Sequence, residues 1–320
     1  MEYRHLGRAG VKVSTISLGS WLTYGMSTDK QVAIDCIHRA YDLGVNFFDT
    51  ANVYNRGEAE KVVGSALSAY SRDSYVLATK VYFPMGEGPN DRGLSRKHII
   101  EQCNASLKRL GVDYIDLYQC HRYDPETPID EVLRAFDDLI RQGKILYAGV
   151  SEWSAVNIAD AVYTARELNL DKIVSNQPAY NLLHRRIEKD IIPLCEREGI
   201  GQIVFSPLAQ GVLTGKYKPG QQPAADTRAA NAEINGFMGE TLSDKTLSAV
   251  QELQKLAEEG GYKVSQLALA WILRQKNVSS AIIGASRPSQ VEENVSAADI
   301  KLSDNDLERI DTILEGVVGY

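Results

Sequence analysis

The sequence has 320 residues, of which 44% are hydrophobic and 24% are charged, a composition typical of a globular protein with ample apolar material for a large core. It has no apolar stretch of about 18 residues and no apolar segment in its charged start MEYRHLGRAG, so we expect a cytoplasmic protein without membrane insertion. The net charge of −7 gives a surface that repels phosphate backbones, so we expect no binding to nucleic acid.

Short apolar strands alternate with amphipathic helices along the chain. The strands are predicted from apolar or β-branched runs of the kind that parallel sheets bury, at residues 16–19, 46–49, 75–80, 115–119, 145–150, 173–176, 201–206 and 280–283. The predicted helices cover residues 30–43, 58–69, 96–110, 129–142, 155–169, 187–198, 264–275 and 288–297. Glycine follows four of these helices and is expected to end them, at Gly44, Gly111, Gly143 and Gly199.

Eight strand–helix units in one chain predict an α/β fold, a (β/α)8 TIM barrel, rather than an open sheet. No linker divides the chain, so we expect a single domain over residues 1–320. The barrel itself needs about 250 residues. Three segments are expected to hold the remainder: a hairpin at 1–13 that caps the bottom of the barrel, a long Gly/Pro/Ala-rich loop at 207–243, and an extra C-terminal helix at 303–314.

Sequence motifs for several other chemistries are missing. No G-x-G-x-x-G follows a strand, and the string GVLTGKY at 211–217 is too short for a P-loop and has Tyr217 where Ser or Thr would bind magnesium. No H-E-x-x-H occurs, and the five histidines show no ligand spacing, so we expect no metal. The four cysteines form no C-x-x-C pair and are expected to be reduced thiols in the core.

Polar residues stand at the carboxyl ends of the predicted strands, where barrels of this type carry their active sites. Asp49, Lys80 and His121 end the second, third and fourth strands, and Tyr54 follows Asp49 by five residues. A buried lysine needs an anion, which Asp49 supplies, and the ammonium is expected to lower the pKa of the Tyr54 phenol from about 10. Each residue alone has an ordinary structural interpretation, but together they predict a general acid for a carbonyl oxygen.

Longer motifs extend along the chain, among them NFFDTANVYNRGEAEKVVGSAL, RLGVDYIDLYQCHRYDPETPIDE, GKILYAGVSEWS and SPLAQGVLTGKY. With them the sequence resembles the aldo-keto reductase superfamily over its whole length. Within it, RGLSRKHIIE and VSSAIIGAS are most similar to the voltage-gated potassium-channel β-subunits and their bacterial relatives. The resemblance implies a TIM barrel that binds a nicotinamide cofactor without a Rossmann domain.

The resemblance also implies a catalytic tetrad of Asp49, Tyr54, Lys80 and His121. In that reading Tyr54 delivers a proton to the carbonyl oxygen as the hydride arrives from C4 of the nicotinamide. Lys80, held by Asp49, lowers the tyrosine pKa, and a neutral His121 donates a hydrogen bond to the same oxygen. The channel β-subunits carry Asn where this chain has His121, which favours ordinary carbonyl reduction here.

Further residues are assigned by the resemblance to the cofactor, NADP. Those expected at the nicotinamide are Trp21, Ser151, Asn176, Gln177 and Phe205. Those expected at the pyrophosphate follow the seventh strand: Ser206, Pro207, Leu208, Gly211, Lys216 and Arg228. Those expected at the adenosine end follow the last strand: Gly284, Ser286, Arg287, Gln290, Glu293 and Asn294. Arg287 suits a 2′-phosphate and favours NADP over NAD, the alternative being a solvated turn residue.

Aromatic residues near these strand ends are expected to form a wall for the substrate, together with Tyr54 and His121: Trp21, Tyr82, Phe83 and Trp153. Packing within loops is an equal alternative for them.

The sequence therefore predicts an NADPH-dependent reductase that converts aldehydes or ketones to alcohols. The alternative is a cofactor-loaded, redox-sensing or regulatory subunit of a channel or another partner, with slow or vestigial activity. His121, the complete pocket and the absence of an inactivating extension before Met1 favour the enzyme. A metal- or phosphate-dependent lyase lacks ligands. Monomers and ring-like oligomers both occur in the superfamily, so a homo-oligomer stays open.

Overall fold

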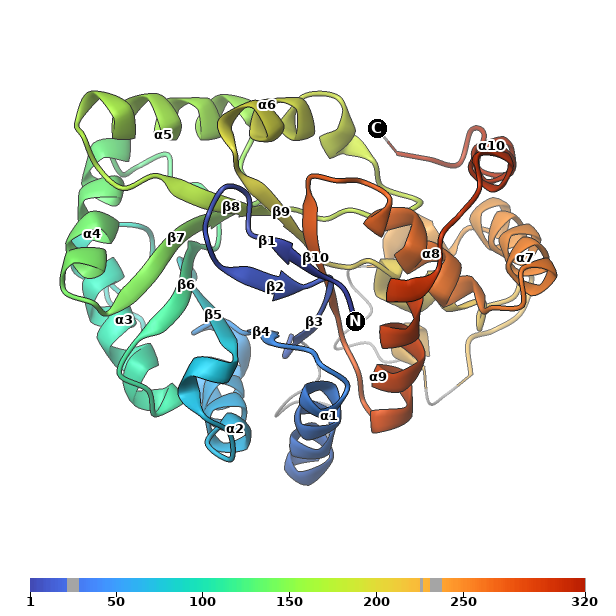
Figure 1. The fold of residues 1–320 in the computed structure, drawn as a ribbon, viewed down its shortest axis with the longest axis horizontal. Helices are drawn as coiled ribbons and strands as arrows, with labels where there is room; N and C mark the ends of the chain where they lie inside the picture. The colour runs from blue at the N-terminus through green and yellow to red at the C-terminus, as the bar shows by residue number, and fades with distance from the viewer. Residues whose placement is uncertain (22–28, 225–226, 231–237, 320) are drawn as a thin grey trace.

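Eight parallel strands close into a barrel in the computed structural model, which describes residues 1–21, 29–224, 227–230 and 238–319. Around the barrel the strands follow the order β10-β3-β4-β5-β6-β7-β8-β9 (Figure 1). Their bounds are β3 Ile16–Gly19, β4 Phe47–Asp49, β5 Val76–Val81, β6 Ile115–Cys120, β7 Ile145–Ser151, β8 Ile173–Gln177, β9 Gly201–Val204 and β10 Val278–Ile283. The closed parallel barrel confirms the predicted (β/α)8 fold.

Helices surround the barrel and bury their apolar faces against it (Figure 1). They are α1 Lys30–Asp42, α2 Glu58–Leu67, α3 Arg96–Leu110, α4 Ile129–Arg141, α5 Ala155–Glu167, α6 Ile191–Glu198, α7 Asp244–Glu259, α8 Val264–Leu273, α9 Pro288–Val295 and α10 Asp304–Ile313. Short 3-10 helices lie at η1 Tyr54–Gly57, η2 Arg72–Ser74, η3 Arg186–Glu188, η4 Ala209–Thr214, η5 Arg228–Ala230, η6 Gly239–Leu242 and η7 Ser296–Asp299. Within the described ranges, no helix is both long and apolar enough to cross a membrane.

Local sequence signals account for many of the helix ends. The Ser95 hydroxyl accepts a hydrogen bond from the His98 amide at the start of α3, and Gly111 ends that helix in the left-handed region with φ 68°. Ser303 caps α10 in the same way, which confirms the predicted C-terminal helix.

The structure differs from the sequence prediction at α7 and near β9. Helix α7 was not predicted after the 207–243 loop, although Ser243 caps it and Leu247, Val250 and Leu253 give it a buried apolar stripe. The strand expected at 201–206 ends at Val204 because the backbone turns at Ser206, whose φ is 52°.

The N-terminal hairpin closes the end of the barrel at which the strands begin, as predicted. Strands β1 Tyr3–His5 and β2 Lys12–Ser14 pair antiparallel, and the hairpin lies across the barrel in Figure 1. Leu6 and Val13 from the hairpin pack in one apolar cluster with residues from inside the barrel. Because this end is sealed, the opposite end, where the strands finish, is left for a functional site.

Two glycines in the hairpin turn provide a test of this seal. At Gly7 the φ is +58°, and an added Cβ would lie 2.4 Å from the Gly199 carbonyl oxygen, whereas an added Cβ at Gly10 meets nothing within 4 Å. We expect Gly7→Ala to lower the free energy of unfolding by at least about 2 kcal/mol, because it combines backbone strain with overpacking. Urea unfolding should show little change for Gly10→Ala, and equal losses for both variants would contradict the seal.

Candidate active site

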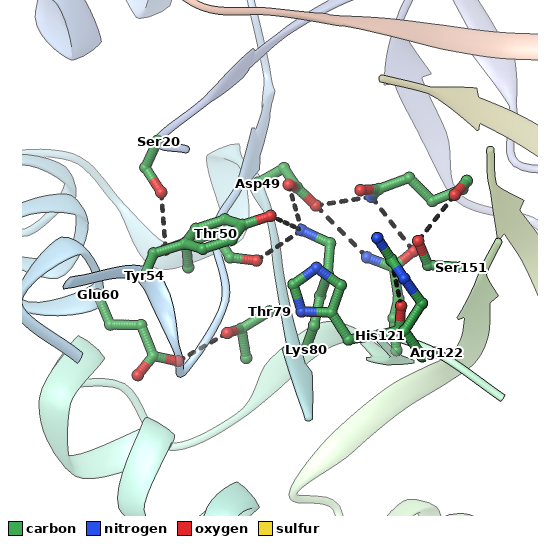
Figure 2. Close-up of polar contacts among 12 residues, drawn as sticks. Ser20, Asp49, Thr50, Tyr54, Glu60, Thr79, Lys80, His121, Arg122 and Ser151 are labelled. Carbon is green, nitrogen blue, oxygen red and sulfur yellow. Dashed lines mark hydrogen bonds and ion pairs between the residues drawn. The ribbon is translucent and has the colours of Figure 1, made fainter. Parts of the chain in front are cut away.

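A buried ion pair joins two neighbouring strands at the open end of the barrel. Asp49 ends β4 and Lys80 lies in β5, and their side chains are 4% and 0% exposed. Lys80 Nζ lies 2.5 Å from Asp49 Oδ1 and also donates to the Thr50 carbonyl oxygen at 2.8 Å. The third contact of Lys80 Nζ is the hydroxyl of Tyr54, at 3.4 Å (Figure 2). The structure thus brings three of the four predicted catalytic residues into direct contact.

The second oxygen of Asp49 is held by amide side chains from β6 and β8. Gln177 Nε2 donates to Asp49 Oδ2 at 2.9 Å, and Gln119 Nε2 approaches the same oxygen at 3.4 Å. Gln177 was predicted to contact the cofactor, and Gln119 was not predicted at all. Gln119 lies one residue before the end of β6, and the alternation of side chains along the strand could have placed it inside the barrel.

Burial and the ion pair set the protonation states of Lys80 and Tyr54. Burial is the largest effect on Lys80 and disfavours the charged ammonium, but Asp49 and Tyr54 together outweigh it, and the pKa of Lys80 lies above its ordinary value. For Tyr54, burial raises the pKa above 10, and the opposing effect of Lys80 does not reverse this. The expectation that Lys80 brings the phenol pKa below its ordinary value is therefore wrong for this structure, because burial dominates. Tyr54 holds its proton firmly.

His121 follows β6 and is neutral. Burial, reinforced by the charges of Lys80 and Arg122, holds its pKa well below 6.5. Its ring stands edge-on to Tyr54, with centroids 5.6 Å apart, and edge-on to Phe83 at 4.9 Å. His121 Nδ1 is buried and has no hydrogen-bond partner among the described residues. The fourth member of the predicted tetrad thus lies beside the Tyr54 phenol as an uncharged imidazole.

The loop that carries Tyr54 has an unusual backbone. Asn55, Arg56 and Gly57 follow Tyr54 with φ of 46°, 51° and 91°, all in the left-handed region that non-glycine residues rarely adopt. This turn leads directly into α2.

A buried carboxylate fastens α2 to its neighbours. Glu60 Oε1 accepts from the hydroxyl of Thr79, the residue before Lys80, at 2.6 Å, and Glu60 Oε2 pairs with Arg109 of α3 at 2.5 Å (Figure 2 shows the Thr79 contact). An added Cβ at Gly57 would lie 2.5 Å from Arg109 Cδ, so this turn tolerates only glycine there. Sequence analysis missed this anchor, which fixes the Tyr54 loop relative to the strand of Lys80.

The residues predicted to hold a carboxamide lie at the ends of β7 and β8. The Ser151 hydroxyl donates to the Gln177 carbonyl oxygen at 2.8 Å. Asn176 Nδ2 donates to Gln202 Oε1 at 3.1 Å, while Asn176 Oδ1 is buried without a partner in the described part of the chain. Glu152, which was not predicted, follows Ser151 with φ 57° and accepts from the Ala179 amide at 2.7 Å.

The loop after β9 is strongly bent. Ser206, Ala209, Gln210 and Gly211 all have positive φ, and Gln210 Nε2 donates to the Ser206 hydroxyl at 2.7 Å. Lys216 lies close by, since a Cβ on Gly211 would come within 3.3 Å of Lys216 Nζ. Pro207 and Leu208 form the turn between these residues. Arg228 begins η5, and its side chain lies outside what the structure describes.

Phe205 and Trp21 meet edge-on at the ends of β9 and β3, with ring centroids 6.5 Å apart. The structure therefore brings these two predicted nicotinamide contacts together.

The segment predicted to hold the adenosine end connects β10 to α9. Gln290 Oε1 accepts from the Ser286 amide at 2.9 Å, and Arg287 is the residue at the N-terminal cap of α9. Glu293 instead bridges to α8, pairing with Lys263 at 2.6 Å. Gly284 is exposed at the end of β10, and Asn294 is buried inside α9.

The four aromatic residues predicted to contact substrate fall into two groups. Phe83 packs edge-on against His121, and Tyr82 meets Phe83 edge-on at 5.2 Å, so this pair lies next to the predicted tetrad, whereas Trp21 contacts Phe205. Trp153 is only 1% exposed and packs edge-on against Tyr123 at 5.1 Å. For Trp153 the structure favours the alternative, packing within the loops, because its side chain is buried against Tyr123 of the loop after β6.

Comparison with known proteins agrees with this geometry. The model of the Aldo/keto reductase family matches residues 15–315. A putative voltage-gated potassium channel subunit beta of Schizosaccharomyces pombe is 46% identical, over 98% of this chain and 93% of the relative. Two probable voltage-gated potassium channel subunits beta are similar at 45% in Arabidopsis thaliana and 44% in Oryza sativa subsp. japonica, each over 94% of this chain and 92% of the relative. These matches confirm the resemblance on which the sequence prediction was based.

The Glu60–Arg109 anchor can be tested on α2 itself. Glu60→Gln leaves the mostly buried Arg109 without its counter-charge and should lower the free energy of unfolding by about 3 kcal/mol. Glu58→Gln is the matched control, because Glu58 pairs with Lys61 on the same helix in the open, and its loss should be below about 0.5 kcal/mol. If urea unfolding shows the same loss of unfolding free energy for Glu60→Gln and Glu58→Gln, the Glu60–Arg109 pair does not anchor α2.

Proposed function

The chain belongs to the aldo/keto reductase family, and from this premise we propose that it is an NADPH-dependent oxidoreductase that reduces aldehydes or ketones to alcohols. The observation that carries the proposal is the sealed contact of Asp49, Lys80 and the Tyr54 hydroxyl, with a neutral His121 beside them. This is an arrangement for placing one proton on an oxygen that gains negative charge.

Several features of the chain fit a nicotinamide dinucleotide. Asn176 Oδ1, buried without a partner among the residues that the structure describes, offers an acceptor to a carboxamide N–H, and Ser151 and Gln177 lie at the ends of β7 and β8. Gly211 leaves the backbone uncovered beside the Lys216 ammonium, as close approach of a pyrophosphate requires. The start of α9 with Ser286 and Arg287 suits a phosphate at the adenosine end. When bound, NADPH supplies the hydride for the carbonyl carbon.

The chain's own residues manage the proton. Tyr54, whose pKa is raised by burial, keeps its proton until a substrate oxygen takes it. Lys80, at 3.4 Å, then stabilises the phenolate that is left, and Asp49 keeps the ammonium in place. His121, being neutral, orients the substrate oxygen by a hydrogen bond and does not compete as a proton donor.

A second function is favoured by the names of the relatives. At 44–46% identity over nearly the whole chain, the relatives are named putative or probable channel β-subunits, so a cofactor-loaded regulatory subunit with slow activity is the alternative. Steady-state NADPH consumption with a panel of small aldehydes separates the two functions, because only the enzyme turns over at a useful rate.

Removing the Tyr54 hydroxyl tests the general acid. Tyr54→Phe keeps the ring and should lower kcat for a good aldehyde by at least about 100-fold, the usual contribution of general acid catalysis, with NADPH affinity nearly unchanged. Tyr163→Phe on the exposed face of α5 is the control and should match the parent. If Tyr54→Phe keeps most of the parental kcat in stopped-flow reduction, the assignment of Tyr54 is wrong.

The preference for NADPH is expected to depend on Arg287. Arg287→Ala removes one charge-assisted contact to the 2′-phosphate, worth about 1.5–3 kcal/mol, and should narrow the ratio of NADPH to NADH affinity by at least about tenfold. Arg197→Ala, which removes an exposed charge at the end of α6, should leave the ratio unchanged in fluorescence titration. Equal affinity of the parent for both cofactors would contradict the assignment.

A further inference from the structure

Arg122 stands next to His121 and has no role in the mechanism above. Its Nη1 donates to the His121 carbonyl oxygen at 2.6 Å, and its Cζ lies 5.5 Å from the centre of the Phe83 ring. In Figure 2 the guanidinium lies beside the His121 ring, on the side toward Ser151 and away from Tyr54. The side chain is half-buried, so its position is fixed by the backbone oxygen and the Phe83 face while part of it stays accessible.

The charge of Arg122 is not neutralised within the described part of the chain. Burial is the main cause of the pKa shifts of Tyr54 and His121. The positive charges of Lys80 and Arg122 each lower these two pKa values, so both cations lie near the phenol and the imidazole. Lys80 has the Asp49 carboxylate at 2.5 Å. Arg122 forms no ion pair with a described acidic residue. As far as the described residues go, Arg122 is therefore a positive charge without a paired carboxylate beside the proposed carbonyl site, in a protein with net charge −7.

We propose that Arg122 binds a carboxylate of the substrate, so that the site prefers aldehydes and ketones that carry a carboxylate near the carbonyl group. A guanidinium presents five N–H donors in a planar fork that matches a carboxylate, and only one of its nitrogens is engaged by His121. Because the Phe83 contact already orders the side chain, little further ordering opposes binding. This inference rests on the proposed function and names the substrate class of the same site.

A pair of aldehydes of the same shape provides the test. 4-Carboxybenzaldehyde and 4-nitrobenzaldehyde carry planar groups of similar size at the same position, one anionic and one neutral. We expect the ratio of kcat/KM for the carboxylate to that for the nitro compound to fall at least tenfold in Arg122→Gln. Arg134→Gln, which removes an exposed charge on α4, is the matched control and should keep the ratio within about twofold.

Ligand binding gives a second readout that does not need turnover. Benzoate should bind the complex of protein and NADP at least tenfold more weakly in Arg122→Gln than in the parent, and Arg122→Lys, which keeps the charge but loses the fork, should fall between them. If Arg122→Gln does not fold, Arg122→Lys is compared with the parent instead. We then expect a lower ratio of kcat/KM for the carboxylate to that for the nitro compound, and weaker benzoate binding.

The outcomes separate this inference from the proposed function. If 4-nitrobenzaldehyde is reduced but the ratio does not change in the Arg122 variants, Arg122 does not recognise carboxylates, while the reductase proposal stands. If neither aldehyde is reduced although NADPH binds, the reductase proposal fails, and benzoate affinity then decides alone: a loss in the Arg122 variants supports the carboxylate site and no loss contradicts it.

Discussion

The buried ion pair between Lys80 and Asp49 is the constraint on which the rest of the site depends. An isolated charge at 0% exposure would be prohibitively costly, so the lysine needs the carboxylate, and the carboxylate needs donors for its second oxygen. Adjacent parallel strands place the two side chains side by side, with Asp49 opposite Ala78 in the register of β4 and β5. The Gln177 amide completes the shell from across the barrel. The barrel therefore holds the Lys80–Asp49 ion pair in place at the end where the strands finish.

Burial and the charges around this ion pair set the pKa values of Tyr54 and His121. Since Lys80 is neutralised by Asp49, it lowers the pKa of Tyr54 too little to overcome burial, and the phenol keeps its proton. The same burial keeps His121 uncharged. Beside this pair lie a proton donor, Tyr54, and an uncharged ring, His121, and Arg122 next to them pairs with no acidic side chain that the structure describes. In the proposed reaction, such a site would stabilise the negative charge that develops on the substrate oxygen.

The sequence predicted the features that are local or periodic and missed those that depend on distant contacts. The barrel, the hairpin cap and the meeting of Asp49, Lys80, Tyr54 and His121 follow from strand ends that share one face. Helix α7 had a local signal in Ser243 and its apolar stripe that was overlooked. The Glu60–Arg109 pair joins residues 49 positions apart on two helices, and the direction of the Tyr54 pKa depends on how deeply the phenol is buried; neither is written in a local pattern.

The pH dependence of a single turnover tests the central claim, that Tyr54 is a firmly protonated acid beside Lys80, most directly. The proposed reduction needs the protonated phenol, so its rate would be lost as pH rises through the Tyr54 pKa, which lies above 10. His121 is needed in its neutral form, and its pKa lies well below 6.5. The account predicts that the rate of NADPH oxidation by a saturating aldehyde stays level from about pH 6.5 to about pH 9.5 and falls only above that. A decline with a midpoint between about pH 7 and 9 would contradict it, because the phenol would then lose its proton below the ordinary tyrosine pKa of about 10.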